Sequence, residues 1–172
     1  TSYERDGRYL EGTGSLVLDH VARVAYACRS PRTDEGLVDR WCAELGYRAE
    51  LFDATDAEGV AYYHTNVMLS IGSDFAVLAA ESIAPADRDR VRSELRDTGR
   101  RVVEISRAAV AGFAGNVLEL ATWDEALGDA RVLVMSKAAR AALGDAQYRQ
   151  LAGAVDSVLV VPVPTIERVG GG

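Results

Sequence analysis

The chain contains few cysteines, few aromatic residues and almost no lysine. Of its 172 residues, two are cysteine, 7% are aromatic, and Lys137 is the only lysine. Cys28 and Cys42 are too few for a disulfide framework, and they suit a reducing compartment. We therefore predict a cytoplasmic protein.

The sequence also lacks the features that would indicate a membrane or a nucleic acid as partner. A membrane-spanning helix needs about 20 consecutive apolar residues, and no run of that length is present. The first residues are polar, so no signal peptide is visible. The net charge is −7 and no basic tract occurs, whereas nucleic-acid binding requires a basic patch. We expect neither partner.

Metal and cofactor signatures are missing as well. The two histidines, His20 and His64, and the two cysteines do not have the spacing of metal ligands. Gly12 and Gly14 are expected to precede a strand rather than a helix, which argues against a phosphate-binding loop. No cofactor is predicted.

What the sequence does contain is an internal order of short elements that returns along the chain. Residues 15–28 indicate two short strands with a polar turn at 19–20. Thr33 or Asp34 then begins a helix that ends at Gly46. Residues 49–52 form the closing strand, so the order is β-β-α-β.

The same order returns twice, with a period of about fifty residues. The second copy has a hairpin at 67–79, a helix between 84 and 99, and a strand at 101–105. The third has a hairpin at 117–135, a helix through Tyr148, Leu151 and Val155, and a strand at 158–161. The pattern predicts an α+β protein of repeated units; the alternative is an ordinary α+β domain with a coincidental period.

A polar segment that contains glycine or asparagine precedes each hairpin, and another closes the chain. These segments are residues 11–14, 63–66, 114–116 and 167–172. In units arranged around an axis they would converge on one central polar site. No hairpin follows the fourth segment, and the first residues lack a preceding unit. We therefore expect three units of a longer ring.

Five motifs in this order resemble the guanidino-group-modifying superfamily, which has the pentein fold. They are Leu10-Glu-Gly-Thr-Gly-Ser-Leu16, Cys28-Arg-Ser-Pro-Arg-Thr33, Tyr63-His-Thr-Asn-Val-Met68, Phe113-Ala-Gly-Asn116 and Thr165-Ile-Glu-Arg-Val-Gly-Gly-Gly172. The superfamily includes arginine deiminases, dimethylarginine dimethylaminohydrolases and arginine:glycine amidinotransferases. The chain is most similar to the bacterial amidinotransferase-like, arginine-deiminase-related group that includes citrulline hydrolases.

The resemblance implies an α/β propeller of five β-β-α-β units, of which about three are present here. Residues 1–172 would form a partial pentein domain with units at approximately 11–53, 63–105 and 114–162, incomplete at both ends.

The resemblance also implies roles for individual residues. Glu11 would bind the head group of the substrate, and His64 would act as general acid and base. Arg32, Asn66 and Asn116 are the substrate-binding candidates, with Arg32 on the α-carboxylate of the substrate. Four of these residues have a structural alternative: a solvated acid for Glu11, a hydrogen-bonded structural imidazole for His64, and local backbone bonds for the two asparagines. Arg32 stands near a helix start, where the helix dipole disfavours a cation, so a bound anion would account for it.

The implied activity is hydrolysis of a non-peptide C–N bond in an arginine- or citrulline-like small molecule through a cysteine-linked intermediate. Gly14 and Asn66 stand where relatives carry carboxylates, which argues against a plain arginine deiminase. The difference favours a neutral ureido substrate or another way of binding the distal nitrogens. Cys28 in a strand and Cys42 on an apolar helix face do not match the nucleophile, which is expected just after Gly172. The alternatives are an amidinotransferase and a non-catalytic pentein scaffold, and a homo-oligomer is left open.

Overall fold

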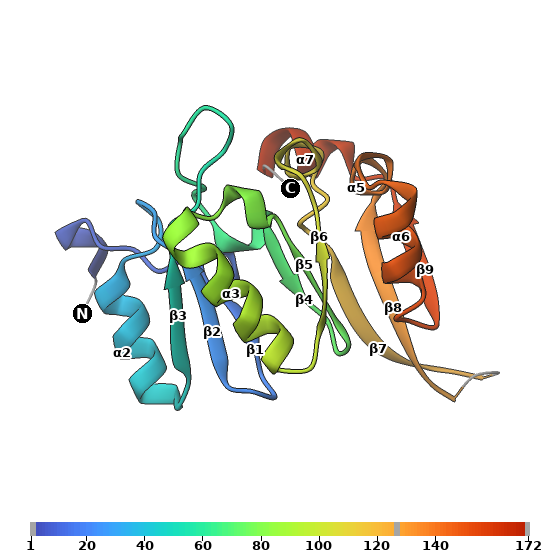
Figure 1. Ribbon diagram of the computed structural model, residues 1–172, viewed down its shortest axis with the longest axis horizontal. Coiled ribbons are helices and arrows are strands. Elements are labelled where there is room, and N and C mark those ends of the chain that lie inside the picture. The colour runs from blue at the N-terminus through green and yellow to red at the C-terminus, as the bar shows by residue number, and fades with distance from the viewer. Residues whose placement is uncertain (1–2, 126–127, 171–172) are drawn as a thin grey trace. The chain divides into compact units, whose positions relative to one another are not determined.

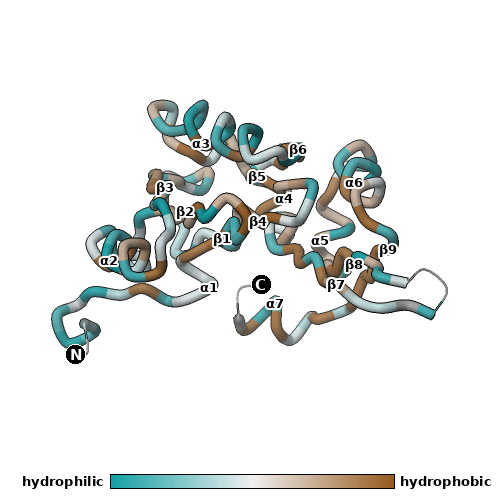
Figure 2. The backbone as a smooth tube through the Cα atoms, turned by 90° about the horizontal axis from the view of Figure 1, so that it is seen from below, coloured by the Kyte–Doolittle hydropathy of each residue, from teal (hydrophilic) through white to brown (hydrophobic). Residues whose placement is uncertain are grey.

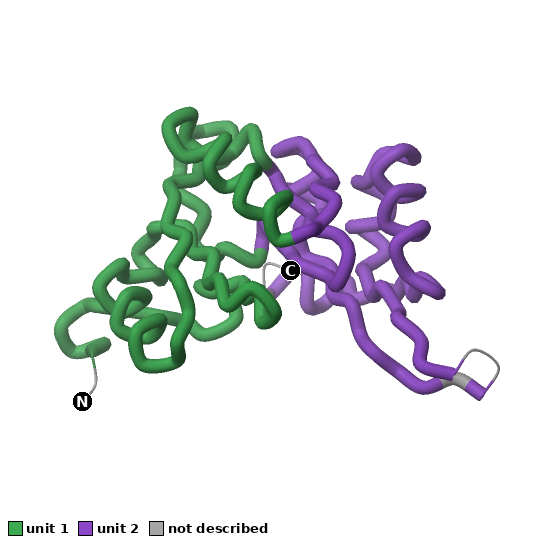
Figure 3. The backbone as a smooth tube through the Cα atoms, turned by 60° about the horizontal axis from the view of Figure 1, so that its bottom comes forward, with its two compact units in different colours: residues 1–66, 80–98 green, residues 67–79, 99–172 purple. Residues whose placement is uncertain are grey.

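The computed structural model describes residues 3–125 and 128–170 of the chain (Figure 1). It comprises two compact units. Unit 1 contains residues 1–66 and 80–98, and unit 2 contains residues 67–79 and 99–172 (Figure 3). Two residues of the third predicted hairpin, 126–127, and the last two glycines of the predicted segment 167–172 lie outside the described residues.

The first sheet has the predicted order and lies in unit 1. Its strands are β1 (Val17–Asp19), β2 (Val24–Cys28) and β3 (Arg48–Phe52). β1 pairs antiparallel with β2, and β2 pairs parallel with β3. The parallel pairing requires a crossover, which the helix α2 (Glu35–Leu45) supplies.

Both predicted ends of α2 are confirmed. The Asp34 side chain accepts a hydrogen bond from the Leu37 backbone N–H, as an N-cap does. Gly46 follows the helix with a φ of +70°, the left-handed conformation that glycine adopts without strain. These two residues account for where the helix begins and ends.

The core of unit 1 lies around β2, whose five residues are all buried. Ala25 and Ala27 pack with Val38 and Cys42 of α2 on one face of the sheet. Glu50 of β3 contacts Arg90 of the helix α3 (Pro85–Asp97). The tube of α3 is largely hydrophilic in Figure 2, and its two buried residues, Val91 and Leu95, lie one helical turn apart.

The second and third sheets lie in unit 2 and repeat the topology of the first. The second contains β4 (Leu69–Ile71), β5 (Phe75–Leu78) and β6 (Arg101–Glu104); the third contains β7 (Leu118–Asp124), β8 (Gly128–Ser136) and β9 (Ser157–Val161). In each, the first two strands are antiparallel and the last two are parallel. The predicted β-β-α-β order is thus present three times.

The prediction of a single helix in the third repeat is wrong, because the chain forms two helices there. They are α5 (Lys137–Ala142) and α6 (Asp145–Ala152). Leu143 and Gly144 adopt extended backbone between them, which interrupts the helical hydrogen bonds. The expected position Val155 lies beyond the end of α6.

Short helices also occur where none was expected. The one-turn helix α1 (Gly12–Ser15) stands between Glu11 and the first strand, so Gly12 and Gly14 do not lead directly into that strand. The helices α4 (Arg107–Ala111) and α7 (Pro164–Gly170) follow β6 and β9. The 3₁₀ turns η1 (Tyr3–Asp6), η2 (Thr65–Val67) and η3 (Ala80–Ser82) complete the described elements.

Candidate active site

Three separate segments of unit 1 bring Glu11, Arg32 and His64 together. Glu11 directly precedes α1, Arg32 lies in the loop between β2 and α2, and His64 directly precedes η2. Nε2 of His64 lies 2.6 Å from Oε2 of Glu11. The Arg32 Nη1 donates a hydrogen bond of 2.7 Å to the other oxygen, Oε1, of Glu11.

The carboxylate of Glu11 therefore has one oxygen on an imidazole and the other on a guanidinium. The Glu11 side chain is 30% exposed and His64 is 22% exposed, whereas Arg32 is 57% exposed. The hydrogen bonds from Arg32 and His64 lower the pKa of Glu11 below its usual value of 4.5. Glu11 is consequently an anion at neutral pH.

His64 is enclosed by the segment that carries Glu11 and by its own neighbour. The rings of Tyr63 and His64 lie 4.8 Å apart between centroids. A Cβ atom on Gly14 would lie 2.8 Å from the His64 ring, closer than any side chain tolerates. The absence of a side chain at position 14 therefore makes room for the imidazole beside Glu11.

Neither cysteine of the chain is an activated thiol. Cys28 and Cys42 are both free and buried. Burial raises the pKa of Cys28 to about 11 and also raises the pKa of Cys42. A thiolate nucleophile has a lowered pKa and access to solvent, so neither residue matches that role.

The two asparagine candidates have different surroundings. Asn66 is half-buried in η2, two residues after His64. Asn116 belongs to unit 2, where it lines a cavity of about 200 Å³ together with Phe113, Leu118 and Glu167. The structure brings Glu11, Arg32 and His64 together within unit 1.

A larger cavity, of about 440 Å³, also has Glu11 among its lining residues. Tyr3, Arg8, Arg40 and Trp41 line it along with Glu11. His64 and Arg32 do not line it, so the contact between Glu11 and His64 is outside this cavity.

Two classes of site find no support in the part of the chain that is described. Within residues 3–125 and 128–170, no group of three or more histidine, cysteine, aspartate or glutamate side chains could hold a metal ion. Over the same residues, no helix has the length and apolar character to cross a bilayer.

Comparison with protein families gives a match over the full chain. Residues 1–172 match the family described as N,N dimethylarginine dimethylhydrolase, eukaryotic. The chain belongs to the dimethylarginine dimethylhydrolase family. No curated protein sequence matches this family member in a direct search.

Solved structures share the fold of this dimethylarginine dimethylhydrolase family member. The N-terminal domain of ArgZ, an arginine dihydrolase from the ornithine–ammonia cycle in Cyanobacteria, matches with a TM-score of 0.70 at 13% identity; the match covers 94% of this chain and 53% of that one. AgrE with ornithine and NAD⁺ matches with a TM-score of 0.71 at 17% identity, over 94% and 21%. SxtG, an amidinotransferase from Microseira wollei, matches with a TM-score of 0.55 at 13% identity, over 90% and 40%.

These matches confirm the predicted pentein superfamily and its fold. The chain is an α+β pentein with three β-β-α-β units in the part that is described. It spans about half the length of the ArgZ domain. At such identities the structures establish the fold alone.

Sequence reasoning identified Glu11, Arg32 and His64 but not the contact between Arg32 and Glu11. Arg32 was expected to need an anion because it stands near a helix start, and the anion it contacts here is the carboxylate of Glu11. The sequence does not indicate a role for Ser15 or Thr65, two buried hydroxyl residues that lie four residues after Glu11 and one residue after His64. Their only signal was their place within the Glu11 and His64 motifs.

Proposed function

We propose that this chain supplies the acid–base pair of a cysteine-dependent hydrolase that cleaves a non-peptide C–N bond in a guanidino or ureido amino acid. The 2.6 Å contact between His64 and Glu11 carries the proposal. A carboxylate that orients an imidazole is the usual support for a histidine that protonates a leaving amine and then activates water.

The family supplies the first candidate for the substrate. N,N-Dimethylarginine is the substrate that the family description names. Arginine is the second candidate, since ArgZ is described as an arginine dihydrolase. Citrulline-like ureido compounds are the third, because Gly14 and Asn66 bring no negative charge to the site.

In the proposed reaction a cysteine thiolate attacks the central carbon of the guanidinium group. The bond from that carbon to a distal nitrogen breaks, and the amine leaves with a proton from His64. Water then loses a proton to His64 and adds to the same carbon, and the thiolate leaves. For N,N-dimethylarginine and one water, the products are citrulline and dimethylamine.

The nucleophile in this scheme comes from outside residues 1–172, because Cys28 and Cys42 are both buried with raised pKa values. Glu11 would hold the head group of the substrate through Oε1, the oxygen that now accepts a hydrogen bond from the Arg32 guanidinium. A planar guanidinium already fits this carboxylate, which supports the assignment of a guanidino substrate.

The test uses the full-length protein with N,N-dimethylarginine, arginine and citrulline in turn. The released amine is quantified, and mass spectrometry follows the cysteine adduct. His64→Ala is expected to lower kcat by about 10²- to 10⁴-fold, the usual contribution of a general acid–base group. Glu11→Gln should lower kcat as well, because the amide cannot hold the imidazole and a cation in the same way.

His20→Ala is the matched control, because His20 is the other histidine of the chain and lies on the surface against Tyr47. It should retain wild-type turnover. Wild-type turnover in His64→Ala would refute the proposal. Absence of both turnover and adduct in the wild type would favour a non-catalytic scaffold, and a product that forms only with an added amine would indicate amidino transfer.

A further inference from the structure

Two buried hydroxyl groups join the three segments that carry Glu11, Arg32 and His64. Ser15 and Thr65 both have no exposed surface. A hydroxyl group donates one hydrogen bond and accepts others. Each of these two hydroxyls does both, so neither remains unsatisfied in the core.

The Ser15 hydroxyl connects the Glu11 segment to the Arg32 segment. Its Oγ accepts a hydrogen bond of 2.9 Å from the Glu11 backbone N–H. The same hydroxyl donates a bond of 2.8 Å to the Arg32 backbone carbonyl. The main chain on both sides of the Glu11–Arg32 ion pair is therefore attached to one side chain.

The Thr65 hydroxyl connects the His64 segment to Ser15 and to the end of β2. Its Oγ1 donates a hydrogen bond of 2.6 Å to the Ser15 carbonyl and accepts one of 2.8 Å from the Cys28 backbone N–H. Thr65 directly follows His64, while Cys28 is the last residue of β2. The loop that carries His64 is thereby attached both to the sheet and to the Glu11 segment.

We propose that Ser15 and Thr65 are positioning residues that set the separation between the His64 imidazole and the Glu11 carboxylate. The kinetic part of this inference rests on the proposed function. The bond from Thr65 to Ser15 joins residues 50 apart in sequence, and no helix or strand lies within residues 53–64. Removal of these bonds allows the His64 loop to shift, and a displacement of about 1 Å can lower a catalytic rate by about 10²-fold.

The variants separate the hydrogen bonds from the shape of the side chain. Thr65→Val keeps the branched shape and removes both bonds, whereas Thr65→Ser keeps the hydroxyl. Thr33→Val is the matched control: Thr33 is 2% exposed, and its Oγ1 has no hydrogen-bond partner within residues 3–125 and 128–170. A purely structural role for Thr65 would change stability without a selective effect on His64.

The first measurement is the NMR spectrum of the imidazole groups in the full-length protein, with His64 assigned by His64→Gln. The His64 ring resonances should move in Thr65→Val and stay at their wild-type positions in Thr65→Ser and Thr33→Val. The second measurement is turnover. In Thr65→Val, kcat should fall about 10- to 100-fold with little change in KM, and Thr65→Ser should restore it.

Unchanged His64 resonances in a folded Thr65→Val protein would overturn the inference. If Thr65→Val does not fold, Ser15→Ala takes its place, because it removes the two bonds of the Ser15 hydroxyl and is judged by the same spectrum. A wild-type protein that hydrolyses no guanidino or ureido compound would contradict the proposed function, while the spectra would still decide whether the two hydroxyls position His64.

Discussion

Glu11 shows how one side chain links the two charged groups of the candidate site. Its carboxylate contacts the His64 imidazole through one oxygen and the Arg32 guanidinium through the other. Both partners stabilise the anion, which is why the pKa of Glu11 is lowered. Each neighbour can therefore be tested by a single substitution that leaves Glu11 itself unchanged.

The contact between His64 and Glu11 can be tested at Gly14, whose missing side chain leaves room for the imidazole. In Gly14→Ala, the new methyl group would lie 2.8 Å from the His64 ring, so the ring must move away from its present place. We expect kcat to fall by about 10-fold or more and the His64 ring resonances to shift. Gly99→Ala is a useful comparison, because no atom approaches that position and only its φ of +86° is unfavourable. Full turnover in Gly14→Ala would show that the ring tolerates displacement.

The other partner of Glu11 is Arg32, whose side chain is more than half exposed. If it turns from Glu11 to the α-carboxylate of a substrate, Arg32→Gln should raise KM for amino-acid substrates by about 10-fold, as loss of an interaction of roughly 1.4 kcal/mol would. For a guanidino amine without the carboxylate, KM should stay the same or fall. Steady-state kinetics give KM for each of the two substrates. An equal change in KM for both would contradict the binding of the substrate α-carboxylate by Arg32.

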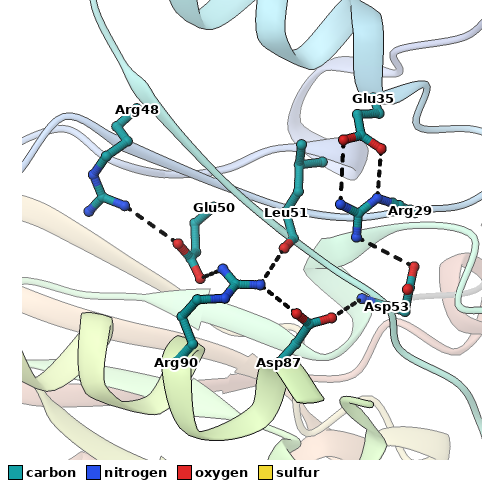
Figure 4. Close-up of polar contacts among 8 residues, drawn as sticks. All are labelled: Arg29, Glu35, Arg48, Glu50, Leu51, Asp53, Asp87 and Arg90. Atoms are coloured by element: carbon teal, nitrogen blue, oxygen red, sulfur yellow. Dashed lines mark hydrogen bonds and ion pairs between the residues drawn. The ribbon is translucent and has the colours of Figure 1, made fainter. Parts of the chain in front are cut away.

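At the scale of elements, ion pairs connect β3, α2 and α3 within unit 1 (Figure 4). Arg90 of α3 donates to the Glu50 carboxylate, to the Leu51 carbonyl at 2.8 Å and to Asp87 at 2.6 Å. Arg48 of β3 lies 3.4 Å from the other oxygen of Glu50. Arg29 contacts Glu35 at 2.8 Å and Asp53 at 3.6 Å.

Glu50 is the buried member of this network, with a side chain that is 5% exposed. Burial raises the pKa of Glu50, and the charges of Arg90 and Arg48 oppose that effect. A buried carboxylate is costly unless it is paired, so α3 stays on β3 partly because Arg90 neutralises Glu50.

Arg90→Ala should therefore destabilise the protein by about 1–3 kcal/mol, because one oxygen of the buried Glu50 carboxylate loses its partner and only the longer contact with Arg48 remains. Arg40→Ala is the matched control, because Arg40 pairs with Glu44 on the surface of α2 and both side chains are 61% exposed. That change should cost only about 0–1 kcal/mol. Urea unfolding gives the free energy of unfolding of both variants. An equal loss of stability in the two would mean that Arg90 does not stabilise the buried Glu50 carboxylate.

At the scale of the whole molecule, acid should weaken the fold. The pKa values of Glu11, Asp34 and Glu35 are lowered, by hydrogen bonds from Arg32, Arg8 and Arg29 respectively. As the pH falls, the unfolded chain binds protons at these groups before the folded chain does. Their contribution to stability is complete above their usual values of 4.5 and 3.8 and is lost as the pH falls through the lowered ones.

The contribution of Glu50 to the pH dependence of stability has the opposite sign, because its raised pKa lets the folded state take up a proton first. The pKa of Asp87 is lowered as well. With four lowered carboxyl groups against one raised, we expect the urea midpoint to fall between about pH 5 and pH 3. Arg8→Gln should make this dependence shallower, since Asp34 then loses its cation. A midpoint that does not change with pH over this range would contradict the prediction.

The regular elements could be predicted from sequence where local chemistry specifies them. Asp34 and Gly46 mark the ends of α2 because a side-chain cap and a left-handed residue act within one turn of chain. The helices α1, α4 and α7 were missed because four to seven residues carry too little periodicity to be recognised. The break between α5 and α6 was missed because its local signal is the single Gly144, and an isolated glycine does not by itself end a helix.

The sequence by itself determined the order of β-β-α-β units and indicated Glu11, Arg32 and His64 as candidate site residues. Only the tertiary structure decided which atoms meet: Arg32 with Glu11 across 21 residues, His64 with Glu11 across 53, and the Ser15 and Thr65 hydroxyls between their segments. The physical reason is the distance along the chain over which each interaction acts. Caps, turns and apolar periodicity act over a few residues, whereas these contacts depend on how separate loops meet beside a sheet whose packing involves the whole unit.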